Sequence, residues 1–554
     1  MLRPPRALCL LITLYSFTTV LSAQEQPLDL GDVTEKHVMI PMRDGVKLSA
    51  YLYFPKGDGP WPVLFEQRYA NLRGKNSRVS FAEMASYGYV VCIENFRGAQ
   101  QSEGTWIAYR ALQWGEKRDG YDTVEWLAKQ PWSTGKIGTF GSSQGGYAQN
   151  YLAVTQPPHL VCQFMVDTGL SLYHEGYFIG GAAKPNRFKR MDAVARVPEH
   201  NRQLVREWFK HPTYDDYWKA EDCTLHFDKM NVPCFTIGSW YDYMCVGSVQ
   251  SYIGREHKGG TNSRGKQQLF VGPWLHGRFN KVNKVGEMTY PENAKVDVMA
   301  LMIRWFDHHL KGKDNGAERD PKVRYYVMGA VGEKNAPGNV WRTADDWPVP
   351  VTETPYFLQA AGKLSLNKPT EKKAATGFLG DPHHPAAIPS LSFPGARDAR
   401  AYEMQKEVRT FTTDVLQKPT EWTGNVRAEL SVSSSAKDTD FIVRITDVYP
   451  DGRSILIVDS IRRARFRDGF EKEVLMEPGK VYKLAFDLGW LSQIFNRGHR
   501  IRVTVASTGA PFYEPNPNTG ELITIEFPKN AVIAKNKVHH DRTFSSRIIA
   551  PVRQ

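Results

Sequence analysis

Short apolar runs bounded by polar turns alternate with amphipathic stretches in the first part of the chain. Two strand-like runs flank the turn signal at residues 42–45, which predicts a β-hairpin over residues 38–53. Strands that alternate with helices are typical of an α/β fold with a parallel sheet. The further predicted strands cover residues 62–67, 89–93 and 136–140, and the predicted helices cover residues 81–87, 119–129 and 147–154.

The pattern becomes irregular and rich in aromatic residues between residues 156 and 232, where helical stretches such as 201–209 occur. We expect an inserted, mostly helical cap there. Strand-like runs return at residues 234–238 and 268–271. The amphipathic stretch 296–310 predicts a long helix that closes the α/β domain.

Beyond the polar linker at residues 312–319, short alternating runs separated by turn signals replace the helical pattern. This change predicts an all-β domain over residues 320–554, either a sandwich or a jelly roll. The predicted architecture is an α/β domain in two parts, 36–155 and 233–312, around the cap, followed by the β domain. The predicted β-domain strands cover residues 323–328, 428–432, 441–448, 455–461, 483–486 and 501–505.

Composition and charge narrow the class of protein. The chain of 554 residues is too long for one ordinary core, and its 41% hydrophobic and 12% aromatic residues exclude a disordered chain, a collagen and a coiled coil. The formal net charge of +12 is spread along the chain, without a long run of Lys and Arg. We therefore expect no nucleic-acid partner.

Residues 1–23 have the three parts of a secretory signal peptide. Arg3 and Arg6 supply positive charge, an apolar run covers residues 7–21, and Ala23 offers a small residue before the cleavage point. An uncleaved anchor is the alternative, although the run is short for a membrane span. We expect a secreted or periplasmic protein with no membrane span after cleavage.

The cysteines and histidine pairs suggest no metal centre. The spacings of the cysteines match no zinc motif, so we expect buried thiols with at most one disulfide bridge. The histidine pairs at residues 308–309 and 383–384 lack convergent ligands, so we expect no metal and no cofactor. The cysteines are Cys9, Cys92, Cys162, Cys223, Cys234 and Cys245.

Candidate chemistry begins at the G-x-S-x-G pattern of residues 141–145, which stands between a predicted strand and a predicted helix. A sharp strand–turn–helix corner needs small residues on both sides of the serine, and it exposes the serine Oγ. Ser143 is therefore the candidate nucleophile. An ordinary Gly/Ser turn is the alternative, and Ser142 lacks the flanking glycine spacing.

A serine nucleophile requires a base and an acid that orients the base. Asp242 and His276 each follow a predicted strand, and they come after Ser143 in the chain order of α/β-hydrolases. The backbone N–H of Gln144 is the first candidate donor for the oxyanion, and the Tyr69 hydroxyl is the second. The alternative for Tyr69 is a packed aromatic ring.

Several motifs of the chain belong together. They are MRDGV (42–46), ENFRGAQQSEG (94–104), GSSQGG (141–146), GSWYD (238–242) and GPWLHG (272–277), with two more in the β domain at residues 438–452 and 498–508. Together they resemble the cocaine esterase / X-Pro dipeptidyl-peptidase family of serine hydrolases. The resemblance implies an α/β-hydrolase core, a helical cap and a C-terminal jelly roll. It also implies Ser143 as nucleophile, His276 as base, Asp242 as orienting acid, and Tyr69 with the Gln144 N–H as oxyanion hole.

Departures from the family pattern bear on the substrate. The residue after the nucleophile is commonly Tyr in this family, whereas here it is Gln144. The α-amino acid ester hydrolases of the family hold the substrate ammonium with carboxylates just after the triad Asp, where this chain has Tyr243, Met244 and Cys245. Glu175 in the cap is a lone acid that could serve instead. The sequence therefore predicts an ester hydrolase that acts on an uncharged acyl group, with an X-Pro dipeptidyl peptidase as the alternative.

Aromatic residues of the cap fit an apolar or aromatic acyl pocket, or they pack the cap against the core. The expected partner is a small ester or a short peptide, and a homodimer is left open. A non-catalytic protein that binds glycans or surfaces through its jelly roll is an alternative of a different class. The aromatic residues are Tyr173, Tyr177, Phe178, Trp208, Tyr217 and Trp218.

Overall fold

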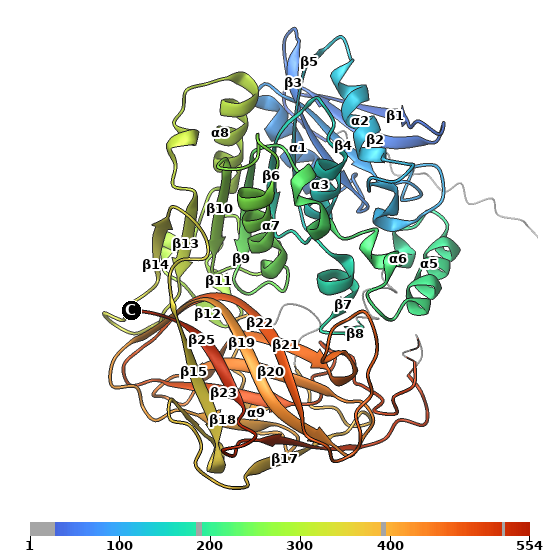
Figure 1. The fold of residues 1–554 in the computed structure, drawn as a ribbon. Coiled ribbons are helices and arrows are strands. Elements are labelled where there is room, and N and C mark those ends of the chain that lie inside the picture. Colours follow the sequence, from blue (N-terminus) through green and yellow to red (C-terminus); the bar gives the residue numbers. More distant parts are fainter. Residues whose placement is uncertain (1–27, 184–190, 389–394, 523, 525–526) are drawn as a thin grey trace, which may run out of the picture.

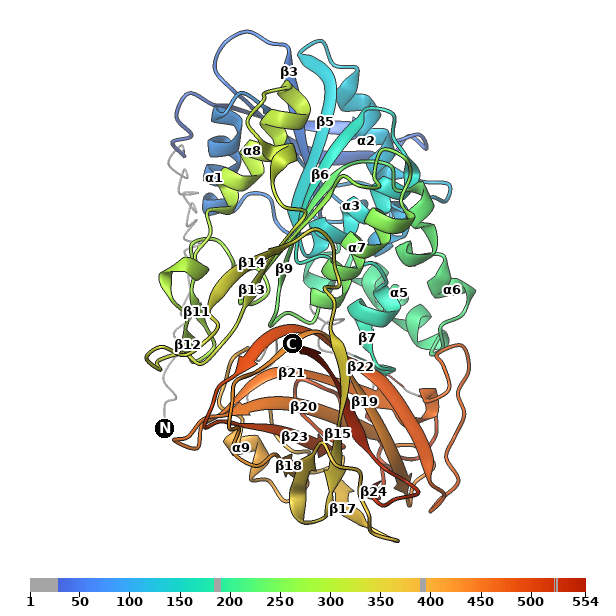
Figure 2. The same ribbon diagram turned by 60° about the vertical axis from the view of Figure 1, so that its left-hand side comes forward.

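Two large β-sheets stand one above the other in the computed structural model (Figures 1 and 2). The structure describes residues 28–183, 191–388, 395–522, 524 and 527–554. The predicted signal peptide and Cys9 lie outside the described residues. The first sheet carries helices on both faces, and the second belongs to the C-terminal half of the chain.

The first sheet has the strand order β1-β2-β4-β3-β5-β6-β9-β10-β13-β14. The strands from β4 to β13 in this order run parallel, whereas β1, β2 and β14 pair antiparallel. The hairpin β1–β2 confirms the prediction for residues 38–53. The strands are β1 (Thr34–Pro41), β2 (Lys47–Phe54), β3 (Trp61–Arg68), β4 (Val90–Asn95), β5 (Ser133–Ser142), β6 (Leu160–Val166), β9 (Cys234–Ser239), β10 (Gln267–Gly272), β13 (Val323–Val327) and β14 (Val340–Ala344).

Helices cover both faces of this sheet because successive side chains of a strand point to opposite faces. Val63 of β3 packs with Val124 and Leu152 of α2 and α3, whereas the next residue, Leu64, packs in the cluster that holds Phe81 of α1 and Phe306 of α8. The α/β core predicted from the alternating pattern is therefore present. The helices are α1 (Lys75–Ser86), α2 (Asp119–Ala128), α3 (Gln144–Thr155), α7 (Cys245–Lys258) and α8 (Val298–Lys311).

Two predicted boundaries differ from the sheet boundaries. β6 lies between β5 and β9 in the first sheet, although its residues fall inside the cap predicted over residues 156–232. Gln163 interrupts the apolar run of β6, and its amide is buried against Thr139 Oγ1 (3.1 Å) and Gln149 O (2.8 Å). β13 pairs with β10, so the first sheet extends beyond residue 320, where the β domain was predicted to begin. An alternating pattern shows that a strand exists but not which sheet it joins.

The cap follows β6 and touches the second sheet through a short hairpin. The backbone N–H of Arg463 donates to Gly180 O at 2.8 Å. Gly180 has a positive φ of 56°, and a Cβ there would lie 1.7 Å from Ile461 O, so only glycine fits this contact. The cap elements are the π-helical turn η2 (Leu172–Tyr177), β7 (Phe178–Ile179), β8 (Ala182–Ala183), the 3-10 turns η3 (Met191–Ala193) and η4 (Cys223–Lys229), α5 (Pro198–Lys210) and α6 (Asp216–Lys219).

The second sheet forms the predicted C-terminal jelly roll. Its strand order is β17-β24-β19-β25-β15-β16-β18-β23-β20-β21, and β22 pairs with β19. The strands are β15 (Thr352–Gln359), β16 (Lys363–Ser365), β17 (Ala375–Gly380), β18 (Arg409–Thr412), β19 (Thr420–Ser434), β20 (Asp440–Val448), β21 (Ser454–Arg463), β22 (Tyr482–Phe495), β23 (Arg500–Ala506), β24 (Ala534–His539) and β25 (Arg547–Arg553). Shorter elements are β11 (Lys284–Val285), β12 (Met288–Thr289) and α9 (Arg400–Glu403).

One continuous hydrophobic cluster joins the two sheets. Trp347 is 1% exposed, and its ring contacts those of Trp240 just after β9, Tyr325 of β13 and Trp490 of β22. None of the helices in the described ranges combines the length and the apolar character of a membrane span. The five cysteines in those ranges are buried free thiols.

Candidate active site

Ser143 stands at the corner between β5 and α3. Its φ of 56° and ψ of −110° lie in a region that residues other than glycine rarely adopt. The backbone N–H of Ser143 donates to Val166 O at 3.0 Å, which ties the corner to the end of β6. The predicted strand–turn–helix corner is thus present, with the serine partly exposed.

A buried glutamate explains the two glycines of the G-x-S-x-G pattern. A Cβ on Gly145 would lie 2.7 Å from Glu66 Oε1, and a Cβ on Gly141 would lie 2.9 Å from the same oxygen. Glu66 is 4% exposed, and burial raises the pKa of its carboxyl although Arg68 opposes this effect. The glycines therefore leave the space that the Glu66 side chain fills below the corner.

The three residues predicted from strand-end positions form one hydrogen-bonded chain. His276 Nε2 lies 2.8 Å from Ser143 Oγ, and His276 Nδ1 lies 2.7 Å from Asp242 Oδ2. The Asp242 side chain is fully buried, and its Oδ1 accepts the Met244 backbone N–H at 3.0 Å. With a proton on Nδ1, the imidazole is oriented to accept the serine proton at Nε2.

Sequence reasoning missed a second buried acid, Asp167, which follows β6. Its Oδ2 accepts the Gly277 backbone N–H at 2.9 Å, next to His276 in the chain. One ligand atom each of Asp167, Asp242 and His276 lies within 4.8 Å of the others. Burial and the negative charge of Asp242 raise the pKa of Asp167 to about 7. The signal that indicated Asp242, an acid directly after a strand, would have found Asp167 had β6 been recognised.

The loop after β3 presents Tyr69 beside the nucleophile corner. Gln144 Oε1 accepts the backbone N–H groups of Tyr69 (2.8 Å) and Ala70 (3.1 Å). Asn95 holds the same loop, because its Nδ2 donates to Arg68 O (3.1 Å) and Ala70 O (2.9 Å). The Gln144 side chain, at which the chain departs from the family pattern, is therefore used to fix this loop.

The Tyr69 ring packs edge-on against Phe96, Trp106 and Tyr109, with centroids 5.7–6.3 Å apart. The Tyr69 and Ala70 amides already donate to Gln144 Oε1, so the hydroxyl is the group of Tyr69 that can still donate to an oxyanion. The first N–H of α3, that of Gln144, is the other, since the first amides of a helix have no intrahelical partner.

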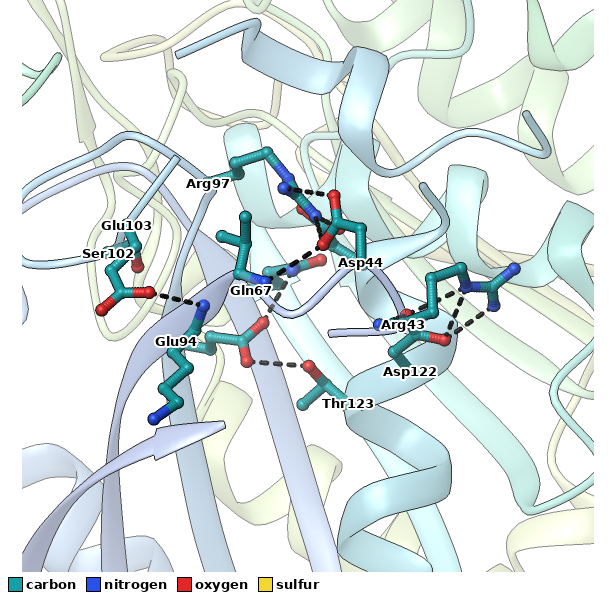
Figure 3. A network of polar contacts seen from close by, with 12 residues as sticks. Arg43, Asp44, Gln67, Glu94, Arg97, Ser102, Glu103, Asp122 and Thr123 are labelled. Carbon is teal, nitrogen blue, oxygen red and sulfur yellow. Dashed lines mark hydrogen bonds and ion pairs between the residues drawn. The ribbon is translucent and has the colours of Figure 1, made fainter. Parts of the chain in front are cut away.

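Residues of two of the family-like motifs form a polar network that includes Gln67 at the end of β3 (Figure 3). Arg97 donates to Asp44 at 2.8 Å and to Asp119 at 2.7 Å, which ties the hairpin β1–β2 to α2. Gln67 Nε2 donates to Glu94 Oε1 at 2.7 Å. The motifs at residues 42–46 and 94–104 are thus joined to each other, and Glu94 holds Gln67 just before the Tyr69 loop.

The predicted acyl-pocket aromatics of the cap pack with one another instead. Tyr177 stacks on Trp208 with centroids 4.0 Å apart, and Trp208 and Trp218 are each 1% exposed. These six side chains belong to one hydrophobic cluster or pack against it, and none lines the cavity described next. The packing alternative therefore describes them correctly.

A cavity of about 580 Å³ opens where the α/β core, the cap and the jelly roll meet. Asp242 and Tyr243 form part of its wall, whereas Ser143 and His276 do not. The Tyr243 ring lies parallel to the His276 imidazole, with centroids 6.2 Å apart. The cavity is thus adjacent to the triad through Tyr243.

The positions considered for binding an ammonium group carry no free carboxylate. Met244 and Cys245 are 0% and 3% exposed. Glu175 lines the cavity, but its Oε2 accepts the Leu170 N–H at 3.1 Å, and burial raises the pKa of Glu175 to about 8. Its carboxyl is therefore largely uncharged at neutral pH and offers little attraction to a cation.

Neither histidine pair belongs to a group of three or more metal-ligating side chains within the described ranges. His309 packs on Trp305 at 4.1 Å between ring centroids, and His308 Nδ1 lies 3.2 Å from Lys313 O.

Comparisons with known proteins cover nearly the whole chain. The family model for X-Pro dipeptidyl-peptidase (S15 family) matches residues 44–203 and 185–278, and the model for the X-Pro dipeptidyl-peptidase C-terminal non-catalytic domain matches residues 315–549. Cocaine esterase from Rhodococcus sp. (strain MB1 Bresler) is 30% identical over 93% of this chain and 98% of its own.

Two solved structures share the fold over nearly their full length. An aminopeptidase from the marine sediment archaeon Thaumarchaeota archaeon has a TM-score of 0.83 and 25% identity, and the match covers 97% of this chain and 99% of that one. An α-amino acid ester hydrolase has a TM-score of 0.82 and 22% identity, with 98% and 100% covered.

Proposed function

Because this chain belongs to the cocaine esterase / X-Pro dipeptidyl-peptidase family of serine hydrolases, we propose that it hydrolyses carboxylic esters through Ser143, His276 and Asp242. The observation that carries the proposal is the continuous chain of hydrogen bonds, 2.8 Å from Ser143 Oγ to His276 and 2.7 Å from His276 to Asp242. These distances are within the reach that proton transfer requires.

In the acylation step, His276 Nε2 takes the proton of Ser143 while Oγ attacks the ester carbonyl carbon. Asp242 holds the imidazole in the tautomer with hydrogen on Nδ1 and stabilises the imidazolium that forms. The tetrahedral intermediate then collapses, the bond to the alcohol oxygen breaks, and His276 returns the proton to the leaving alcohol. Water repeats the sequence on the acyl-enzyme and releases the acid.

The negative oxygen of the tetrahedral intermediate would accept hydrogen bonds from the Gln144 N–H and the Tyr69 hydroxyl. The Gln144 side chain and Asn95 hold the backbone of the Tyr69 loop at 2.8–3.1 Å, aromatic contacts hold the Tyr69 ring, and the Gln144 N–H belongs to α3. Such preorganised donors stabilise the transition state more than the ground state.

The surroundings of the triad favour esters over peptides with a free N-terminus. A dipeptidyl peptidase has to bind a substrate ammonium, but Met244 and Cys245 offer no carboxylate and Glu175 is largely uncharged at neutral pH. An acyl group without positive charge therefore meets a lower desolvation cost here.

A serine variant with a matched control tests the reaction. Ser143→Ala is expected to abolish hydrolysis of 4-nitrophenyl acetate and labelling by a fluorophosphonate probe, whereas Ser142→Ala should retain labelling. Unchanged hydrolysis in Ser143→Ala would disprove the assignment. If the wild type is neither labelled nor active, a binding function of the jelly roll becomes the better account.

The peptidase alternative is separated by substrate choice. We expect the wild type to hydrolyse 4-nitrophenyl butyrate much faster than Gly-Pro-4-nitroanilide. A higher kcat/KM for the anilide would establish the X-Pro dipeptidyl peptidase instead.

Export is proposed from Arg3, Arg6 and the apolar run at residues 7–21. Fractionation of expressing cells and N-terminal sequencing of the product test it. A product that starts near Gln24 in the periplasm or the medium supports export, and an uncleaved chain in the cytosol argues against it.

A further inference from the structure

The cavity beside the triad contains an arginine that forms no ion pair with the residues that the structure describes. Arg462, at the end of β21, lines the cavity together with Tyr243. Among the same residues, its buried Nε has no hydrogen-bond partner. Its NH1 donates to the backbone oxygen of Phe466, at 3.2 Å.

The surroundings of Arg462 are mainly aromatic. Its guanidinium carbon lies 4.4 Å from the ring centroid of Phe470 and 5.9 Å from that of Phe486. Burial lowers the pKa of Arg462 to about 10, so the side chain is still charged at neutral pH. Burial also lowers the pKa of His174, which packs on the same Phe470 ring. Among the described lining residues, Arg462 therefore supplies the positive charge.

Several acids of the cavity wall are engaged elsewhere. Asp242 is paired with His276, and Glu175 is largely uncharged at neutral pH. Asp222 accepts hydrogen bonds from the Tyr214 hydroxyl (2.6 Å) and the Thr224 backbone N–H (2.8 Å). These groups have no carboxylate oxygen near enough to form an ion pair with Arg462.

The remaining two acids lie on the strands of Arg462 and its neighbour. Asp459 Oδ2 lies 3.5 Å from Arg444 Nε. Asp487 is exposed on β22, and its negative charge acts on Arg462 from more than ion-pair distance. Asp487 therefore competes only weakly with a substrate carboxylate for Arg462.

We propose that Arg462 binds a carboxylate of the substrate, so that the preferred esters carry a carboxylate remote from the bond that is cleaved. This inference rests on the proposed ester hydrolase function. A guanidinium binds a carboxylate with charge-assisted hydrogen bonds, and the aromatic walls would hold the apolar part of the ester between the carboxylate and the scissile bond. The walls include Trp240, Phe470, Phe486, Trp490, Phe512 and Tyr513.

The sequence predicted an uncharged acyl group and kept an X-Pro dipeptidyl peptidase as the alternative. Arg462 is a reason to expect a negatively charged group on the substrate, which departs from that prediction if the carboxylate belongs to the acyl chain. The carboxylate could belong to the acyl chain or to the alcohol, because both extend from the ester group and the cavity wall includes Tyr243 but not Ser143.

Matched ester pairs test the preference in the wild type. The first arm compares mono-4-nitrophenyl esters of glutarate, adipate and suberate with 4-nitrophenyl esters of monoacids of the same length. The second arm compares 4-carboxyphenyl butyrate with phenyl butyrate. We expect kcat/KM to be about 10-fold higher for the anionic member in one arm, since a hydrogen bond to a charged group is of that order. Equal or lower values in both arms would overturn the proposal.

Variants then assign the preference to Arg462. Arg462→Gln should lose the preference, about 10-fold in kcat/KM for the anionic ester, with neutral esters and fluorophosphonate labelling unchanged. Arg467→Gln is the control, because Arg467 also lies over an aromatic ring, 4.3 Å from the Tyr482 centroid, but does not line the cavity. Asp487→Asn should raise kcat/KM for the anionic ester, because it removes the competing carboxylate.

An equal loss for neutral and anionic esters in Arg462→Gln would contradict the proposal. If that variant does not fold, the comparison of ester pairs in the wild type still decides the matter. Hydrolysis of neutral esters without an anionic preference refutes only this inference. Absence of all hydrolysis and of labelling refutes the proposed function itself.

Discussion

Tyr69→Phe tests whether the hydroxyl of Tyr69 serves the oxyanion. The change removes one oxygen and keeps the ring, which contacts Phe96, Trp106 and Tyr109 at 5.7–6.3 Å between centroids. The nearby backbone amides cannot replace the hydroxyl without losing their hydrogen bonds of 2.8 and 3.1 Å to Gln144 Oε1. Only the Gln144 N–H would then remain as a donor.

The magnitude follows from the loss of one of two preorganised donors. Removal of such a donor costs about 2.7–4 kcal/mol of transition-state stabilisation, which is about 10²–10³-fold in kcat. Because the hydrogen bond strengthens only as the oxyanion forms, kcat and kcat/KM should fall together while KM changes little. The free energy of unfolding should change by less than about 1 kcal/mol, since no hydrogen bond of the hydroxyl to described residues is lost.

Steady-state kinetics with 4-nitrophenyl butyrate and urea denaturation provide the two measurements. Tyr121→Phe is the control: it removes a tyrosine hydroxyl from α2, away from the proposed oxyanion hole, and should retain the wild-type kcat. A fall in kcat below about 5-fold for Tyr69→Phe, or an effect confined to KM, would refute the assignment. Those results would indicate that the hydroxyl of Tyr69 does not stabilise the oxyanion.

Two further predictions concern the support of the site. Gly145→Ala places a Cβ 2.7 Å from the buried Glu66 Oε1 and should lower the free energy of unfolding by about 1–3 kcal/mol. Gly115→Ala is the control and should not lower it, because a Cβ there meets nothing within 4 Å. Equal urea midpoints for the two variants would contradict this prediction. The pKa of Asp167, raised to about 7 in the folded state, contributes a fall in the free energy of unfolding as pH rises from about 4 through 7. Asp167→Asn should show a smaller fall than the wild type in urea titrations at different pH, and identical pH dependence in both proteins would show that Asp167 does not contribute to it.

Local patterns were sufficient to predict the three residues that we propose as the triad. Ser143 is indicated by glycines on both sides and by a strand and a helix around it. Asp242 and His276 are indicated because parallel strands end at one edge of a sheet, so residues that follow them meet there. The structure brings these three side chains together as the order of the strands implies.

The residues that support the triad could not be predicted in the same way. Glu66 lies inside an apolar strand, and only the packing of β3 against β5 brings it below the nucleophile corner. Asp167 was missed because Gln163 interrupts the apolar run of β6, so the strand that precedes Asp167 was not predicted. A polar residue inside a strand is tolerated when it finds hydrogen-bond partners, and those partners are distant in sequence.

The sequence by itself determined the α/β core, the cap, the jelly roll and the residues for serine chemistry, because periodicity and turn residues act over a few neighbouring positions. Only the tertiary structure decided that β13 joins the first sheet, that the Gln144 side chain fixes the Tyr69 loop, and that Arg462 faces a cavity next to the triad. Each of these depends on contacts between segments far apart in the chain, and no local pattern of hydrophobic and polar residues encodes which distant segments meet.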